Sequence, residues 1–381
     1  MASVRKRAWV TSKGVEKTAW VVDYTHKGKQ HIKTFPTKRE ATAWRADMQH
    51  EVKEGIHTPA TTSITVAEAG AAWFAQAEMD GLEASTVMQY RQHLKYHITP
   101  FLGDVKLAEL TPASVIDFRA RLRKEDRSPV MVRKVITSLG AILAAAMATG
   151  RVARNVVREQ ARQQTRQRRL EKRHDKRLEV GVDIPSKDEL RAILAAAQGR
   201  WRPLVVTAIF TGLRASELRG LTWDDVDLER AVIRVKQRAD RWNNIGSPKS
   251  ATSQREVPLA PIVVNTLREW KLACPKSELD LAFPSRLGNV ESLPNLHRRG
   301  LGTLQVAAGI TSDREHPKYG LHAFRHAAAS LFIEQGFSPK RVQALMGHSS
   351  IQMTFDTYGH LFPSKDDDAA AMQQLQARLV G

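Results

Sequence analysis

The stretch LMGHSSIQMTFDTYGHLF, residues 345–362, is the most informative part of the sequence. It places Tyr358 ten residues after His348, and its apolar spacing predicts a short helix from Ile351 to Tyr358. A phenol can serve as a nucleophile, but because its pKa is about 10, neighbouring positive charge must help it to ionise. The meaning of this stretch therefore depends on the polar residues that precede it.

Two polar clusters upstream supply such charge. TGLRASELRGLTWDDVDL, residues 211–228, contains Arg214, and LHAFRHAAAS, residues 321–330, contains His322 and Arg325. A guanidinium is always charged and holds two phosphate oxygens in a fixed fork. An imidazole titrates near neutrality, so these histidines can bind a phosphate or take the phenolic proton. In isolation, an arginine such as Arg214 is more often a surface ion-pair partner, and a histidine such as His322 is more often a satisfied core residue.

A lysine completes the set. Lys249 lies in GSPKSATSQREVPL, a polar turn between two predicted strands, and can protonate a leaving 5′ oxygen. Lys236 and Arg255 are nearby alternatives for this role. Together, the nucleophile, the cations and the imidazoles fit covalent phosphoryl transfer on a polyanion, without metal or ATP. A metal site from His316, His322 and His326 is possible by count, but no carboxylate pattern supports it.

Composition points to a polyanionic partner. The chain of 381 residues has a net charge of +19, concentrated in residues 1–60 and 151–180. This favours a nucleic acid, although charge alone also fits ribosomal or membrane-surface binding. Cys274 is the only cysteine, and the basic N-terminus has no apolar core behind it, so we expect a cytoplasmic protein. The apolar stretch 135–150 is too short to span a bilayer comfortably.

The pattern along the chain predicts a multidomain, mainly α protein. Residues 1–57 read as three short strands followed by a helix, and residues 64–157 as a bundle of helices. Residues 158–184 are strongly basic and form either a solvated helix or an extended linker. Residues 185–381 read as a mixed, mostly α domain with a C-terminal tail.

The ordered motifs resemble those of the tyrosine recombinases of the phage integrase family. The resemblance covers residues 64–381 and implies a helical, SAM-like core-binding domain followed by a catalytic domain. Residues 1–57 resemble, less specifically, the three-stranded arm-binding module of integrases from temperate phages and integrative elements. The positions that match the family's catalytic residues are Arg214, Lys249, His322, Arg325, His348 and the nucleophile Tyr358.

The resemblance implies a site-specific recombinase that integrates, and in some cases excises, a mobile element. It would act through a 3′-phosphotyrosyl intermediate and a Holliday junction, without a cofactor, as a homotetramer on synapsed core and arm sites. An accessory bending protein and an excision factor are the other partners implied. The tail after residue 365 can dock either on a neighbouring subunit or on its own domain.

Several cationic or aromatic residues are candidates for DNA contact, since cations in a folded sheet or on a helix face must meet solvent or a partner. Two other functions stay open: a type IB topoisomerase-like enzyme with the same chemistry, and a non-catalytic architectural DNA-binding protein. The candidates for DNA contact are Arg5, Arg7, Lys27, Lys29, Lys33, Tyr90, Arg91, Arg133 and Lys134.

Overall fold

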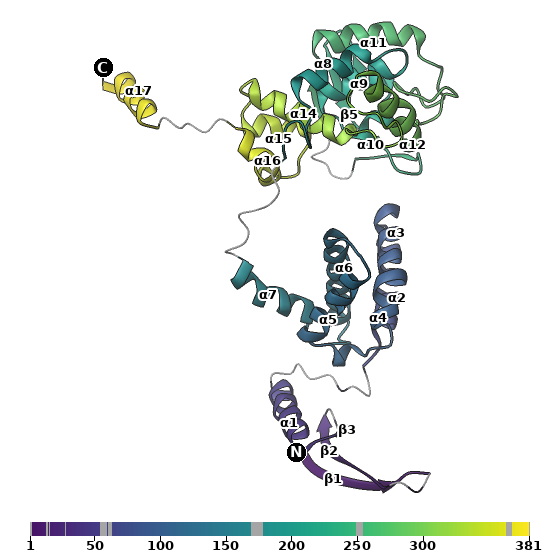
Figure 1. The fold of residues 1–381 in the computed structure, drawn as a ribbon, viewed down its shortest axis with the longest axis vertical. Coiled ribbons are helices and arrows are strands. Elements are labelled where there is room, and N and C mark those ends of the chain that lie inside the picture. Colours follow the sequence, from purple (N-terminus) through teal and green to yellow (C-terminus); the bar gives the residue numbers. More distant parts are fainter. Residues whose placement is uncertain are drawn as a thin grey trace. The chain divides into compact units, whose positions relative to one another are not determined.

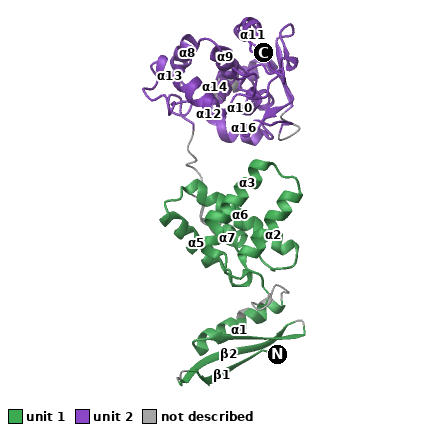
Figure 2. Ribbon diagram, turned by 90° about the vertical axis from the view of Figure 1, so that its right-hand side faces the viewer, with its two compact units in different colours: residues 1–173 green, residues 174–381 purple. Residues whose placement is uncertain are grey.

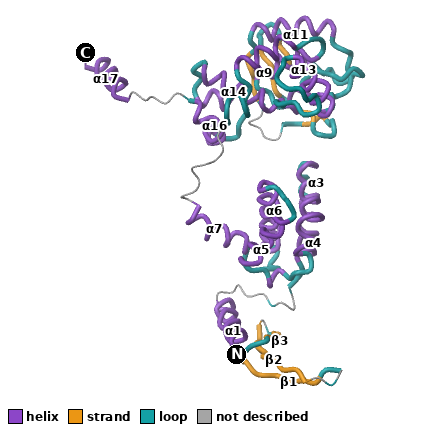
Figure 3. Tube along the Cα trace, in the orientation of Figure 1, coloured by secondary structure: helices purple, strands orange, loops and turns teal. Residues whose placement is uncertain are grey.

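The computed structural model divides the chain into two compact units, residues 1–173 and 174–381 (Figure 2). Among the described residues, helices dominate, and the strands lie in the N-terminal part and in small sheets of the second unit (Figure 3). This confirms the mainly α, multidomain fold expected from the sequence. The structure describes residues 2–12, 14, 16–26, 28–53, 59, 63–168, 178–248, 254–362 and 368–380.

The first unit begins with a three-stranded antiparallel sheet in the order β1-β2-β3, with α1 packed against it (Figure 1). The Thr37 hydroxyl accepts a hydrogen bond from the Glu40 amide at 3.2 Å, which starts the helix. The rings of Tyr24 and Trp44 lie 5.5 Å apart between sheet and helix. The elements are β1 (Ser3–Val10), β2 (Glu16–His26), β3 (Lys29–Phe35) and α1 (Lys38–Lys53).

A helical bundle follows. Phe118, Leu139 and Ile142 are fully buried in its core. The Thr65 hydroxyl and the Glu68 carboxylate form a capping box that starts the first of its helices. The elements are α2 (Val66–Met79), α3 (Ala84–His93), α4 (Thr99–Leu102), the 3₁₀ turn Leu107–Glu109, α5 (Pro112–Lys124), α6 (Pro129–Ala148) and α7 (Val156–Arg168).

A proline usually interrupts a helix, but here the helix continues through Pro100. α3 leads into a π-helical turn, Leu94–Ile98, and then into α4. Proline lacks an amide hydrogen and clashes with the carbonyl four residues earlier, so a wider turn before it relieves the strain. Local backbone adjustment therefore replaces the expected interruption.

α7 corrects the expected boundary of the basic segment. It extends to Arg168, and Val156, Val157 and Gln160 are buried against α5 and α6. The first part of the segment 158–184 thus continues the last helix of the bundle, because Val156 and Val157, just before it, anchor that helix in the core. α6 is also longer than the apolar stretch expected, and by length and composition it could cross a membrane, but half of its most apolar window is buried in the bundle.

The second unit is built around α9, whose Leu204, Val206 and Ile209 are fully buried. α11 and α14 pack against this helix (Figure 1). The helices are α8 (Lys187–Ala196), α9 (Trp201–Thr211), α10 (Ala215–Arg219), α11 (Pro261–Ala273), α12 (Leu293–Asn295), the π-helical Leu296–Gly302, α13 (Thr303–Ala307), α14 (Leu321–Glu334), α15 (Pro339–Met346), α16 (Ile351–Tyr358) and α17 (Asp368–Val380).

Two small sheets complete this unit. β5 pairs with both β4 and β8, and β6 pairs with β7 in a separate hairpin. The fully buried Arg219 donates hydrogen bonds to the carbonyl oxygens of Glu291 and Asp240 at 2.6 and 2.9 Å, which fixes the hairpin beside α10. The strands are β4 (Val226–Asp227), β5 (Val232–Val235), β6 (Arg238–Ala239), β7 (Ile245–Gly246) and β8 (Arg255–Pro258).

Candidate active site

Two glycines in the left-handed conformation end the helices that border the site. Gly212 follows α9 with φ 64°, and Gly347 follows α15 with φ 62°. A Cβ on Gly212 would lie 3.0 Å from both the Ala328 Cβ and the Met346 Sδ. A Cβ on Gly347 would lie 2.9 Å from Nη1 of Arg255. Both positions therefore favour glycine for their backbone conformation, and a Cβ at either would crowd its neighbours.

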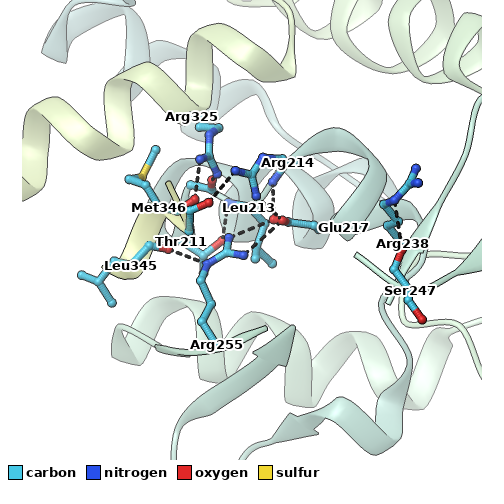
Figure 4. Close-up of polar contacts among 12 residues, drawn as sticks. Thr211, Leu213, Arg214, Glu217, Arg238, Ser247, Arg255, Arg325, Leu345 and Met346 are labelled. Carbon is cyan, nitrogen blue, oxygen red and sulfur yellow. Dashed lines mark hydrogen bonds and ion pairs between the residues drawn. The ribbon is translucent and has the colours of Figure 1, made fainter. Parts of the chain in front are cut away.

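The end of α15 gathers three arginines from three different elements (Figure 4). The last carbonyl groups of a helix have no partner within it and carry partial negative charge, so they attract cations. Here three successive carbonyl oxygens each accept a hydrogen bond from one guanidinium. The pairs are Leu345 with Arg255 at 2.7 Å, Met346 with Arg325, and Gly347 with Arg214 at 2.7 Å.

A buried carboxylate holds two of these arginines. Glu217, only 3% exposed, accepts from Nη1 of Arg214 at 2.6 Å and from the Arg214 amide at 2.8 Å. It also accepts from Nη1 and Nη2 of Arg255 at 3.1 and 2.9 Å. Burial alone would raise the pKa of this carboxyl, but the hydrogen bonds and charge of Arg255, with those of Arg214, lower the pKa to about 2.

Arg325 is the most deeply placed of the three arginines. It lies on α14, is 3% exposed, and donates to the Gly212 carbonyl oxygen at 2.7 Å. Burial and the charge of Arg214 lower the pKa of its guanidinium to about 10. It therefore stays charged at neutral pH, as a phosphate-binding group must.

Tyr358 ends α16 and is buried beside the arginines, with 1% of its surface exposed. Its hydroxyl lies 2.8 Å from Nδ1 of His326. Burial raises the pKa of the phenol to about 12, so the phenol is protonated at neutral pH. Burial, and then the charges of His322 and Arg325, lower the pKa of His326 to about 4. A neutral His326 can accept the phenolic hydrogen bond.

The two predicted histidines lie in the same cluster. The ring of His348 is stacked 6.1 Å from the ring of Tyr358, and its Nδ1 lies 2.9 Å from the Thr354 hydroxyl. The ring of His322 lies 4.4 Å from that of His326. Burial and nearby arginines lower the pKa of both predicted histidines, to about 4 for His348. Within the described residues, the phenol's hydrogen-bond partner is therefore His326 rather than either of them.

Lys249 lies outside the described residues, so its catalytic role stays a prediction. The two alternatives for it have other partners. Nζ of Lys236 lies 2.7 Å from the Asp225 carboxylate. Arg255 forms the fork with Glu217.

Sequence reasoning missed Glu217 and the roles of Arg255 and His326. Glu217 had a local signal, since it follows Arg214 by three residues and can reach back to it from the first turn of α10. The pairing of Glu217 with Arg255 spans 38 residues and has no local signal. The sequence pointed to His326 only as a possible metal ligand. In the described part of the chain, no three His, Cys, Asp or Glu side chains gather as metal ligands would.

The DNA candidates of the N-terminal sheet lie on different faces. Arg5 and Arg7 share one face, and Arg5 pairs with Asp23 at 2.6 Å. Arg7 and Lys29 are exposed. Lys33 lies on the opposite face, with Nζ 4.8 Å from the ring of Trp44 in α1. Lys33 therefore lies beside the helix and does not share a face with the two arginines.

Lys27 lies outside the described residues. In the helical bundle, the ring of Tyr90 packs 4.3 Å from that of Trp73, so this tyrosine is partly engaged within the bundle. Arg91 pairs with Glu78 at 3.2 Å. The remaining candidates, Arg133 and Lys134, are exposed on α6.

Comparisons with known proteins identify a family. Residues 186–365 match the phage integrase family, and residues 66–163 match the phage integrase central domain. A tyrosine recombinase XerC-like protein of Caldanaerobacter subterraneus is 30% identical over 50% of this chain and 54% of its own. The prophage integrase IntR of Escherichia coli K12 is 29% identical over 51% of each chain. The ICEBs1 integrase of Bacillus subtilis is 24% identical over 76% of this chain and 78% of its own.

Solved structures share the fold. The Tn1549 transposon integrase in complex with a circular intermediate DNA aligns with a TM-score of 0.67 and 22% identity, covering 82% of this chain and all of that one. A lambda integrase tetramer bound to a Holliday junction aligns with a TM-score of 0.56 and 18% identity, covering 90% and 95%. The chain spans about half the length of the first two relatives above. It belongs to the phage integrase family, among the tyrosine recombinases.

Proposed function

We propose that this protein is a site-specific DNA recombinase that cuts and rejoins strands through Tyr358. The observation that carries the proposal is the arginine cluster at the end of α15, only a few residues before the helix that ends in Tyr358. A buried phenol beside fixed guanidinium groups suits attack on a phosphodiester, because the cations stabilise charge that develops on the phosphate oxygens.

In the first step, the Tyr358 oxygen attacks the phosphorus and the bond to the 5′ oxygen breaks. The phenolic proton passes to a histidine, and His326 is in place for it at 2.8 Å. Arg214 and Arg325 bind the non-bridging oxygens, and the predicted Lys249 gives the leaving 5′ oxygen its proton. The products are a 3′-phosphotyrosyl bond and a free 5′-hydroxyl, so the linkage retains the energy for rejoining.

In the second step, the 5′-hydroxyl of the partner strand attacks the phosphotyrosine and releases the phenol. One such exchange makes a Holliday junction, and a second pair of subunits resolves it. We therefore propose a homotetramer on two synapsed sites, which integrates a mobile element and, with an excision factor and a bending protein, removes it. Because the substrate is chromosomal DNA, we place the reaction at the nucleoid in the bacterial cytoplasm.

Positive charge outside the catalytic cluster supports a polyanionic substrate. Arg7 and Lys29 are exposed on opposite faces of the N-terminal sheet, and either can contact arm-type DNA. In the second unit, a hollow of about 600 Å³ is lined by arginines from three segments of the chain. Its arginines are Arg200, Arg286, Arg299 and Arg314.

A topoisomerase-like enzyme would share the cleavage step but not the exchange between sites. A two-site recombination assay separates the two functions, because only a recombinase joins ends from different duplexes. An architectural protein would need none of the buried catalytic groups. The arginine cluster and the buried Tyr358 favour an enzyme over this alternative.

The test is Tyr358→Phe, with Tyr319→Phe as the matched control. Tyr319 is equally buried in the same unit, and its hydroxyl bonds Glu189 at 2.9 Å, away from the arginines. We expect Tyr358→Phe to bind DNA in a gel-shift assay and to form no covalent adduct with a nicked suicide substrate. Tyr319→Phe should form the adduct. An undiminished adduct in Tyr358→Phe would refute the nucleophile assignment.

A further inference from the structure

We propose that Arg255 is a positioning residue for DNA cleavage, acting through Glu217 on Arg214. The inference rests on the proposed function, because it assumes that Arg214 binds the scissile phosphate. Arg255 is the first residue of β8, and its side chain is only 6% exposed. Its guanidinium is engaged with protein acceptors, so it would act on the reaction through its neighbours.

The contacts of Arg255 fix the orientation of one carboxylate. Its Nη1 and Nη2 donate to the two oxygens of Glu217 at 3.1 and 2.9 Å. The terminal torsion of a glutamate is soft, so a single hydrogen bond leaves the carboxylate free to rotate. A planar fork on both oxygens removes that freedom. Arg255 therefore sets the plane in which Glu217 presents its oxygens.

That plane in turn places Arg214. The Oε1 atom that Arg255 contacts also accepts from Nη1 of Arg214 at 2.6 Å, while Oε2 accepts from the Arg214 amide at 2.8 Å. A second donor of Arg214 reaches the Gly347 carbonyl oxygen. The guanidinium of Arg214 is thus held from two sides, and one of these sides depends on Arg255.

Arg255 also ties this arrangement to the helix that precedes the nucleophile. Its Nε donates to the Leu345 carbonyl oxygen at 2.7 Å, three residues before His348. One side chain therefore links β8, α10 and the end of α15 (Figure 4). Apolar residues of the same volume would often stabilise the fold as well as a buried Arg–Glu pair does, so stability alone does not explain why this pair is present.

The experiment measures single-turnover cleavage by Arg255→Gln and Arg255→Lys in the full chain. Arg234→Gln is the matched control, because Arg234 on the adjacent strand also pairs with carboxylates but is 31% exposed and outside the cluster. Loss of one preorganised donor at a developing charge lowers rates by about 10²–10³-fold. We expect Arg255→Gln to lose about 10²-fold in cleavage rate, with DNA affinity within about threefold of wild type.

Two modified substrates distinguish positioning from other roles. A 5′-bridging sulfur leaves without a proton donor, so it should not restore Arg255→Gln. A methylphosphonate lacks one phosphate charge, so its cleavage depends less on Arg214. The ratio of the wild-type to the variant cleavage rate should therefore be at least tenfold smaller on this substrate than on the natural one. Arg255→Lys should restore cleavage only partly, since an ammonium cannot form the fork. If Arg255→Gln does not fold, the same ratios of wild-type to variant cleavage rate are measured with Arg255→Lys.

Three results would overturn the proposal. Wild-type cleavage by Arg255→Gln would show that the fork is dispensable. Rescue by the bridging sulfur would make Arg255 a proton donor instead. An equal defect on the natural and methylphosphonate substrates would mean that its role is structural. If wild-type protein forms no adduct through Tyr358 at all, the proposed function fails, and that outcome is separate from these three.

Discussion

Replacing Glu217 with glutamine tests the electrostatic account of the site. The folded protein holds the pKa of this carboxyl at about 2, against an ordinary value of 4.5. Folding therefore favours the charged form of the Glu217 carboxyl, and the carboxylate stabilises the second unit at every pH at which it is ionised. Glutamine keeps the shape of the side chain but removes the charge that Arg214 and Arg255 share.

The magnitude follows from the difference between these two pKa values. It corresponds to about 3 kcal/mol of folding free energy at neutral pH. Because the pKa is depressed in the folded state, this contribution is complete above pH 4.5 and is lost as pH falls through about 2. Glu217→Gln should therefore lower the free energy of unfolding by about 3 kcal/mol at pH 7, by about 1 kcal/mol at pH 3, and by almost nothing at pH 2.

Denaturant unfolding is monitored by hydrogen exchange in peptides from α9 and α10. Because these helices belong to the second unit, the exchange reports the unfolding of this unit separately from that of the first. Glu256→Gln is the control, since Glu256 lies next to Arg255 but its side chain is 52% exposed. We expect the control to change stability by less than about 0.5 kcal/mol at each pH. A Glu217→Gln deficit of the same size at pH 7 and pH 3 would refute the reasoning, because neutral packing rather than charge would then explain it.

Two further predictions concern the reacting groups. Arg214→Ala should abolish cleavage of a suicide substrate and leave the far-ultraviolet circular dichroism unchanged. The side chain is a third exposed, and Glu217 retains its ion pair with Arg255. A lost helical signal would contradict this. His326→Asn should retain a hydrogen bond to Tyr358 but cannot take its proton, so cleavage should slow by about 10²-fold and recover as pH rises. A pH–rate profile like that of the wild type would argue against His326 as the acceptor.

Much of the fold could be predicted because its signals are local. The capping box of Ser186 and Glu189 starts α8, with the Ser186 hydroxyl accepting from the Glu189 amide at 3.2 Å. The boundaries of α15 and α16 follow from apolar spacing and from the glycine between them. The continuation of the helix through Pro100 could not be predicted in the same way, because it depends on how the preceding turn relaxes against the bundle.

The site likewise contains residues that local motifs reveal and contacts that depend on the fold. Arg214, Arg325 and Tyr358 lie in short motifs whose residue types state their chemistry, so they could be named from sequence. The choice of His326 over its neighbours as partner of the phenol depends on side-chain direction in the fold. His322 and His326 are one helical turn apart on α14, and only the packing of α16 decides which of them meets the Tyr358 hydroxyl.

Several hydrogen-bond partners of the arginines in this structure are backbone carbonyl oxygens that a DNA phosphate can replace. Arg325 donates to backbone carbonyl oxygens, and Arg214 divides its donors between Gly347 and Glu217. A hydrogen bond between a guanidinium and a phosphate is stronger than one to a neutral carbonyl. An incoming phosphate can therefore take over the carbonyl-bound donors without breaking the ion pairs of Glu217. These ion pairs keep the guanidinium of Arg214 in place while the exchange occurs, and this makes the carboxylate and its fork with Arg255 the fixed part of the site.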